Sequence, residues 1–244
     1  MIWRMPVSVI VLVLAAVLAL AAALLYGVVG PAPTPAGERI RLPQDARPPG
    51  PGEDYRLLLL GTSLTRRGDW PDRLRERLGE CAAGPVRVER LARAGAASDW
   101  GLAALRERLS RSGAQAPDLV IVEFSGNDAA LAHGFPLFMS RRNHLAIIRA
   151  ARDAGAAVIL ATMSPAWGWN ALERPGQDRY HAIYRDLAAS EGVGLVDTIA
   201  DWRALPAERL RAAVPDDLHP TDEAMAAITV PALAEAVGAI LCRR

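Results

Sequence analysis

From residue 55 onward, short apolar runs alternate with longer segments whose apolar residues recur at helical spacing. Most of the runs are continuously apolar, which is typical of parallel strands that are buried on both faces. We expect strands at residues 56–60, 86–91, 118–124, 157–163 and 194–197, and helices at 69–80, 100–110, 137–153, 178–190 and 221–241. Because strand and helix alternate along the chain, the pattern predicts a three-layer α/β/α fold around a parallel sheet.

The N-terminus carries a second constraint. Residues 7–29 are apolar and uncharged, whereas a helix needs about 20 residues to cross a bilayer and a secretory signal has an apolar core of only about 7 to 15. We therefore expect a single transmembrane helix, an uncleaved signal anchor, within residues 1–30. Arg4 precedes the run and the next charges are Glu38 and Arg39, so the positive-inside rule predicts a domain outside the cytoplasm, in the periplasm or on the outer face.

The rest of the chain divides into a linker and one domain. Residues 31–54 are rich in proline and poor in apolar side chains, which indicates a semi-extended linker. Residues 55–244 are enough for one α/β domain with a sizeable core. All 28 basic residues are arginine and the net charge is +1. This balance does not indicate a nucleic-acid surface, and the absence of lysine excludes Schiff-base and Ser-Lys chemistry.

Candidate catalytic residues fall at the carboxyl ends of the expected strands, where ligands bind in such sheets. Ser63 follows the first strand, in a turn toward a helix, and could act as a nucleophile. His219, in the loop before the last helix, could accept its proton. Asp216 is three residues earlier and could orient the imidazole, with Asp217 as the alternative.

An acyl-transfer site also needs donors for the developing oxyanion. The candidates are the backbone N–H groups of Ser63 and Gly95 and the side-chain amide of Asn127, which follows the third strand. Gly95 lacks a Cβ, so its backbone could approach a ligand closely, although an ordinary turn glycine is an equal alternative. No metal or cofactor motif accompanies these residues, and none is expected.

Together these residues resemble the SGNH hydrolases, also called GDSL esterases and lipases. The matching blocks are Leu-Leu-Leu-Leu-Gly-Thr-Ser-Leu-Thr ending at Thr65, Val-Ile-Val-Glu-Phe-Ser-Gly-Asn-Asp ending at Asp128, and residues 216–220, with a weaker block around Gly95. Thr62 stands where the family usually has Asp, and Arg90 where it usually has Asn. The resemblance implies a flavodoxin-like sheet of strand order 2-1-3-4-5 and places Ser63, Gly95, Asn127 and His219 in the family's site.

The implied strand order also brings the two cysteines together. Cys81 ends the first expected helix and Cys242 ends the last, and in a 2-1-3-4-5 sheet these helices share a face. Both run antiparallel to the strands, so we expect their C-terminal ends to meet, away from the catalytic rim. A Cys81–Cys242 disulfide is compatible with an exported domain.

These observations predict a membrane-anchored serine esterase that hydrolyses carbohydrate acetyl esters or lipid acyl esters through an acyl-enzyme. Ser63, His219 and Asp216 would form the triad, and no cofactor or metal would be required. Trp167 and Trp169 could contact the substrate or pack as a lid over the sheet. Two alternatives are acyl transfer to a cell-envelope glycan, in which a sugar hydroxyl replaces water, and an anchored binding module without turnover.

Overall fold

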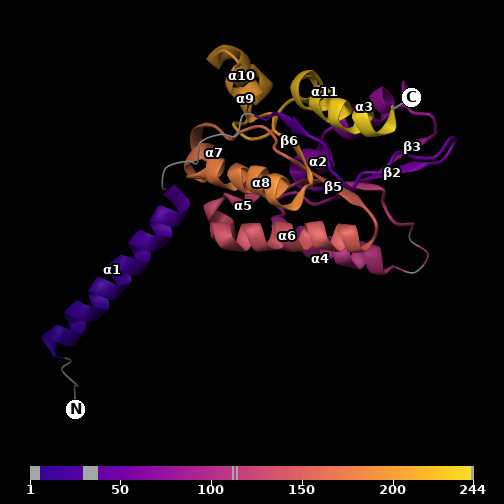
Figure 1. Cartoon of the computed structure of the whole chain (residues 1–244). Helices are drawn as coiled ribbons and strands as arrows, with labels where there is room; N and C mark the ends of the chain where they lie inside the picture. Colours follow the sequence, from indigo (N-terminus) through magenta and orange to yellow (C-terminus); the bar gives the residue numbers. More distant parts are fainter. Residues whose placement is uncertain (1–5, 30–37, 112, 114, 243–244) are drawn as a thin grey trace.

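The computed structural model describes residues 6–29, 38–111, 113 and 115–242, and a six-stranded sheet covered by helices on both faces forms its centre (Figure 1). The strands are β1 (Ile40–Arg41), β2 (Tyr55–Gly61), β3 (Val86–Ala92), β4 (Leu119–Glu123), β5 (Ala157–Ala161) and β6 (Gly194–Val196). Their order is β1-β6-β5-β4-β2-β3. Strands β2 to β6 are mutually parallel, which confirms the five expected strands and the order that the resemblance implied.

Strand β1 makes the sheet mixed, and it lies within residues 31–54, the predicted semi-extended linker. Ile40 pairs with Val196 in the antiparallel sense, and further along the segment the Arg152 guanidinium lies 2.7 Å from the Asp45 carboxylate. Residues 38–42 contain no proline, so each has an N–H that can join a ladder at the sheet edge. The described part of the linker, residues 38–54, therefore belongs to the domain, and residues 30–37 lie outside the described part of the chain.

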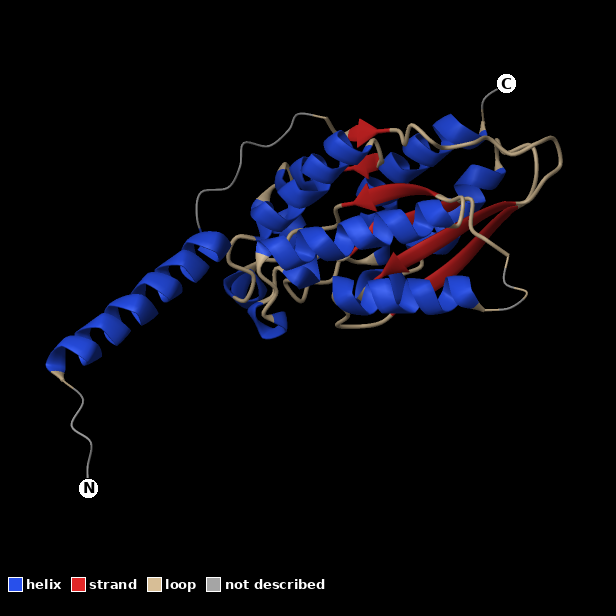
Figure 2. Cartoon of the chain, turned by 60° about the horizontal axis from the view of Figure 1, so that its bottom comes forward, coloured by secondary structure: helices blue, strands red, loops and turns tan. Residues whose placement is uncertain are grey.

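The two faces of the sheet bury alternate side chains of each strand. Along β2, Leu57 and Leu59 join one apolar cluster, whereas Leu58 and Leu60 join the other. All four are at most 1 % exposed, which explains why the strand reads as a continuous apolar run. One face is covered by α3 (Trp70–Gly79) and α11 (Asp222–Leu241), the other by α4 (Ser98–Ser110), α6 (Leu137–Asp153) and α8 (Gln177–Glu191) (Figures 1 and 2).

Helices α3 and α11 lie side by side and are joined at their ends. Cys81 and Cys242 form a disulfide with Cα atoms 5.5 Å apart, a separation that suits such a bond. Helix α11 begins after Thr221, whose hydroxyl accepts a hydrogen bond of 3.2 Å from the Ala224 N–H, as expected for an N-cap. Short helices that the periodicity did not predict are α2 (Ser63–Arg67), α5 (Ser125–Asp128), η1 (Leu131–His133), α7 (Gly168–Leu172), α9 (Ile199–Arg203) and α10 (Ala207–Ala213).

The N-terminal apolar run forms a helix, α1 (Val7–Val29). The side chains described from Ser8 to Leu18 are exposed. Residues 1–5, including Arg4, lie outside the described part of the chain. Among the described residues, the one helix that meets both the length and the hydropathy of a membrane span is α11. Half of its apolar window is buried against the domain, so α11 reads as a core helix, and a membrane role for α1 stays a prediction.

Candidate active site

The predicted nucleophile, Ser63, is the first residue of α2, directly after β2 and the N-cap Thr62. Its side chain lies at the carboxyl end of the sheet, and the residue is only 8 % exposed. Its hydroxyl lies 2.8 Å from His219 Nε2, within hydrogen-bond distance. The sequence separates the two residues by most of the domain, and the fold brings them together at the rim where they were expected.

His219 is held by Asp216 through both its ring and its backbone. Asp216 Oδ2 lies 2.7 Å from His219 Nδ1, and Oδ1 accepts a hydrogen bond of 2.6 Å from the His219 N–H and one of 3.0 Å from the Leu218 N–H. Burial alone would raise the pKa of Asp216, but the hydrogen bonds from His219 and Leu218 outweigh it and lower the pKa below its ordinary value. An ionised carboxylate at Nδ1 favours the tautomer in which Nε2 can accept the serine proton.

Asp217, the alternative partner, has a different position. Its backbone adopts a left-handed conformation with φ of 62°, and its carbonyl accepts a hydrogen bond of 2.8 Å from the Trp167 N–H. A Cβ placed on Gly168 would lie 2.3 Å from Asp217 Oδ2, so the carboxylate lies against the start of α7. The structure therefore brings Asp216, and not Asp217, to the imidazole.

Asn127, in α5, lies next to the loop that carries Gly95. The Asn127 side-chain amide donates a hydrogen bond of 2.8 Å to the carbonyl of Ala96, the neighbour of Gly95, which leaves its second N–H for a ligand. Asn127 lines the same cavity as Ser63. Gly95 has φ of +69°, a conformation that other residues adopt at a cost. The loop is tied to the nucleophile strand by a hydrogen bond of 3.2 Å from the Arg93 N–H to the Gly61 carbonyl.

Beneath the nucleophile lies a carboxyl group that the sequence reading missed, Glu123. It accepts hydrogen bonds of 2.5 Å from the Thr62 N–H, 3.0 Å from the Thr62 hydroxyl and 2.7 Å from the Thr65 hydroxyl. Burial raises its pKa to about 7, against the lowering effect of these bonds. A Cβ on Gly61 would lie 2.1 Å from Glu123 Oε1, so this position needs glycine. Thr62, the residue before the nucleophile, is thus a partner of Glu123.

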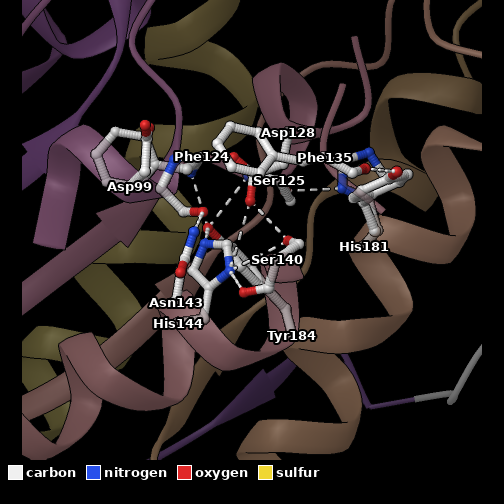
Figure 3. Close-up of polar contacts among 12 residues, drawn as sticks. Asp99, Phe124, Ser125, Asp128, Phe135, Ser140, Asn143, His144, His181 and Tyr184 are labelled. Carbon is white, nitrogen blue, oxygen red and sulfur yellow. Dashed lines mark hydrogen bonds and ion pairs between the residues drawn. The ribbon is translucent and has the colours of Figure 1, made fainter. Parts of the chain in front are cut away.

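A buried hydrogen-bond network holds residues 124–128, the segment after β4 that contains α5 and Asn127 and is here called the Asn127 loop (Figure 3). The Tyr184 hydroxyl accepts bonds of 2.8 Å from the Phe124 N–H and 3.2 Å from the Ser125 N–H. Its single proton is then directed to His144 Nε2, 3.0 Å away, so the opposite nitrogen, Nδ1, donates to the Ser140 carbonyl at 2.8 Å. Burial raises the pKa of Tyr184 and lowers that of His144, so both are uncharged at neutral pH.

The same network ends on Asp128, the residue after Asn127. Asp128 Oδ1 accepts a hydrogen bond of 2.8 Å from the Ser98 N–H, and Oδ2 accepts one of 2.6 Å from the Ser140 hydroxyl (Figure 3). Helices α4, α6 and α8 are therefore all linked to the Asn127 loop. The sequence contains no local signal of this arrangement, because its members come from separate helices.

The two tryptophans that could contact substrate differ in their surroundings. Trp167 is partly buried and packs against the apolar cluster on the α3 and α11 face, as in the lid alternative. Trp169 is 80 % exposed. The neighbouring Asn170 side chain donates a hydrogen bond of 3.0 Å to the Asp216 carbonyl, so α7 lies beside the triad and Trp169 stands near its rim.

Comparison with known proteins supplies independent information on this arrangement. A model of the GDSL-like lipase/acylhydrolase family matches residues 50–227. No curated protein matches the chain.

Solved structures share the fold. A lipase/acylhydrolase from Enterococcus faecalis is 20 % identical, with 74 % of this chain and 96 % of that one covered and a TM-score of 0.63. The structure of TesA is 26 % identical, with coverage of 77 % and 98 % and a TM-score of 0.57. A carbohydrate acetylesterase family member from Sinorhizobium meliloti is 19 % identical, with coverage of 77 % and 99 % and a TM-score of 0.60.

Proposed function

Because the chain belongs to the GDSL-like lipase/acylhydrolase family of SGNH ester hydrolases, we propose that it cleaves O-acyl esters through an acyl-enzyme on Ser63. The observation that carries this proposal is the continuous relay from Ser63 through His219 to Asp216, with contacts of 2.8 and 2.7 Å. A binding module without turnover would not require these three side chains in hydrogen-bond contact.

The reaction begins when Ser63 Oγ attacks the acyl carbonyl carbon and transfers its proton to His219 Nε2. The carbonyl oxygen becomes an oxyanion, which accepts hydrogen bonds from the Ser63 and Gly95 N–H groups and from the free amide N–H of Asn127. His219 then donates the proton to the departing alcohol oxygen as the ester C–O bond breaks. Water, deprotonated by His219, attacks the acyl-enzyme and releases the carboxylic acid and free Ser63.

Asp216 acts through His219. Its carboxylate keeps the proton on Nδ1 and stabilises the imidazolium that forms in each half-reaction. Its two backbone hydrogen bonds fix the loop, so the ring stays directed at Ser63. Removal of this carboxylate should therefore reduce turnover without abolishing binding of the ester.

We further propose that the enzyme works outside the cytoplasmic membrane, held by α1, on an acyl ester of a cell-envelope carbohydrate or lipid. Support comes from the apolar, uncharged sequence of α1 and the exposure of its described side chains. The Cys81–Cys242 disulfide suits an oxidising compartment. Protease treatment of intact spheroplasts should degrade the domain, and survival of the domain until the membrane is lysed would contradict the export.

The catalytic proposal is tested with nitrophenyl acetate and the purified full chain in detergent. Ser63→Ala and His219→Ala should each lower kcat by at least about 10³-fold, as in serine hydrolases generally. Asp216→Asn should lower kcat strongly, whereas the matched variant Asp217→Asn should stay close to wild type. Equal losses in the two aspartate variants would reject the assignment of Asp216.

A further inference from the structure

A small cavity adjoins Ser63, and its lining includes Leu218 but not the triad histidine. It encloses about 20 Å³, roughly the space for one water molecule. Besides Ser63, Asn127 and the polar residues Thr62, Glu123 and Ser125, its walls include three further polar side chains that the proposed reaction does not use, Ser164, Gln177 and His181. None of these three is more than 9 % exposed.

Two polar atoms in these walls have no partner. His181 Nε2 and Ser164 Oγ are buried without a hydrogen bond, and leaving such a group unpaired costs about 1 to 3 kcal/mol. The opposite ring nitrogen, His181 Nδ1, lies 2.9 Å from the Ser125 hydroxyl (Figure 3), so the ring is fixed. Burial lowers the pKa of His181 to about 4, so the imidazole is neutral at neutral pH.

The geometry separates an acyl side from an alcohol side. His219 must reach the leaving oxygen to protonate it, so the alcohol belongs in the groove of about 130 Å³ that His219, Asp216 and Pro220 line together with Ser63. The small cavity shares Ser63 and Leu64 with this groove, but it is lined by Asn127, the proposed oxyanion donor, and not by His219. An acyl group on Ser63 with its oxyanion toward Asn127 therefore extends into the small cavity.

We propose that this cavity selects a short acyl group with a hydroxyl on the carbon next to the carbonyl, of which hydroxyacetyl is the smallest. This inference rests on the proposed esterase function and names the acyl class that it accepts. Because the cavity has room for only about one water-sized group, it can take the terminal OH or CH₃ of a short acyl group and excludes longer chains. A hydroxyl both donates and accepts, so it can pair with His181 Nε2 in either tautomer and with the Ser164 hydroxyl. The Glu123 carboxyl group also lines the cavity, which disfavours a carboxylate there.

The test compares hydroxyacetyl and propionyl esters of one alcohol, which have the same number of heavy atoms and differ in OH against CH₃. The full chain in detergent is assayed for kcat/KM on each ester, and the result is the ratio of the two values. Ser164→Ala should lower this ratio about tenfold, the equivalent of one buried hydrogen bond. Because both esters are used with every variant, their different intrinsic reactivities cancel.

Two more variants keep the test decisive. His181→Gln should also lower the ratio. Thr229→Val is the matched control, since Thr229 Oγ1 is another buried, unpaired hydroxyl but lies in α11 outside the cavity, and its ratio should remain within about twofold of wild type.

Each outcome decides between the proposals. If wild type hydrolyses both esters but Ser164→Ala and His181→Gln have the wild-type ratio of kcat/KM values, the cavity does not bind the hydroxyl and this inference is wrong. If wild type hydrolyses neither these esters nor the acetate, the proposed function falls as well.

Discussion

Glu123 offers a quantitative test of how the nucleophile turn is built. Its carboxyl group is buried under Thr62 and Thr65, and burial raises its pKa from the ordinary 4.5 to about 7. The folded state therefore holds a proton that the unfolded state releases between about pH 4.5 and 7. By linkage, stability from this group is greatest below the unfolded pKa and decreases as pH rises toward the folded pKa.

The size of the effect follows from the shift. A difference of about 2.5 pKa units, at 1.36 kcal/mol per unit, is about 3 kcal/mol of unfolding free energy across this window. Glu123→Gln has nearly the same shape but cannot ionise. The free energy of unfolding of wild type minus that of Glu123→Gln should thus decrease by about 3 kcal/mol between pH 4.5 and 7.5.

The measurement is urea denaturation of residues 38–244 at several pH values, followed by the fluorescence of the buried Trp70 and Trp202. Taking the difference between the two proteins removes contributions shared by other groups, including His181, whose lowered pKa acts in the opposite direction. Glu76→Gln, which removes an exposed carboxylate, controls for the loss of one charge. A wild-type minus Glu123→Gln difference that stays constant within about 1 kcal/mol across the window would refute the reasoning.

Three further predictions concern the scaffold. Cys81→Ser, or reduction of the Cys81–Cys242 bond, should lower the free energy of unfolding by about 5 kcal/mol, since the bond closes a loop with a sequence separation of 161 residues; an unchanged urea midpoint after reduction would contradict this. Tyr184→Phe should lower the free energy of unfolding by about 1 to 3 kcal/mol, because two buried N–H groups lose their acceptor. It should also lower kcat on nitrophenyl acetate, and an unchanged kcat would show that the network does not position the Asn127 loop. A fragment that begins at residue 55 lacks the Ile40 pairing with β6 and should unfold at a lower urea concentration than residues 38–244. Equal urea midpoints would show that residues 38–54 do not stabilise the domain and act only as a linker.

The central part of the fold could be predicted from the sequence. Strands β2, β4, β5 and β6 are apolar because they are buried on both faces, so local composition indicates their position in the sheet. Ser63, Asn127 and His219 could be placed at one rim because the carboxyl ends of parallel strands share an edge. The structure adds the contacts among them.

What escaped prediction depends on pairing between distant segments. Strand β1 has only two residues, too few for any periodicity to be recognised. Glu123 lies beside the nucleophile turn because it pairs with Gly61 in the register of β2 and β4, and no local pattern reveals that register. The sequence showed Thr62 only as a departure from the usual first motif, whereas in the structure its hydroxyl and N–H hold this buried carboxyl group.

The central claim is that Ser63 is a nucleophile activated by His219, and covalent labelling tests it most directly. The full chain in detergent is treated with a fluorophosphonate, in which the attacking oxygen displaces fluoride, and the adduct is located by mass spectrometry of intact protein and peptides. We predict one adduct, on the peptide that contains Ser63, with no labelling of Ser63→Ala and much slower labelling of His219→Ala. Labelling that persists in Ser63→Ala, or that falls on another residue of the wild-type chain, would contradict the account.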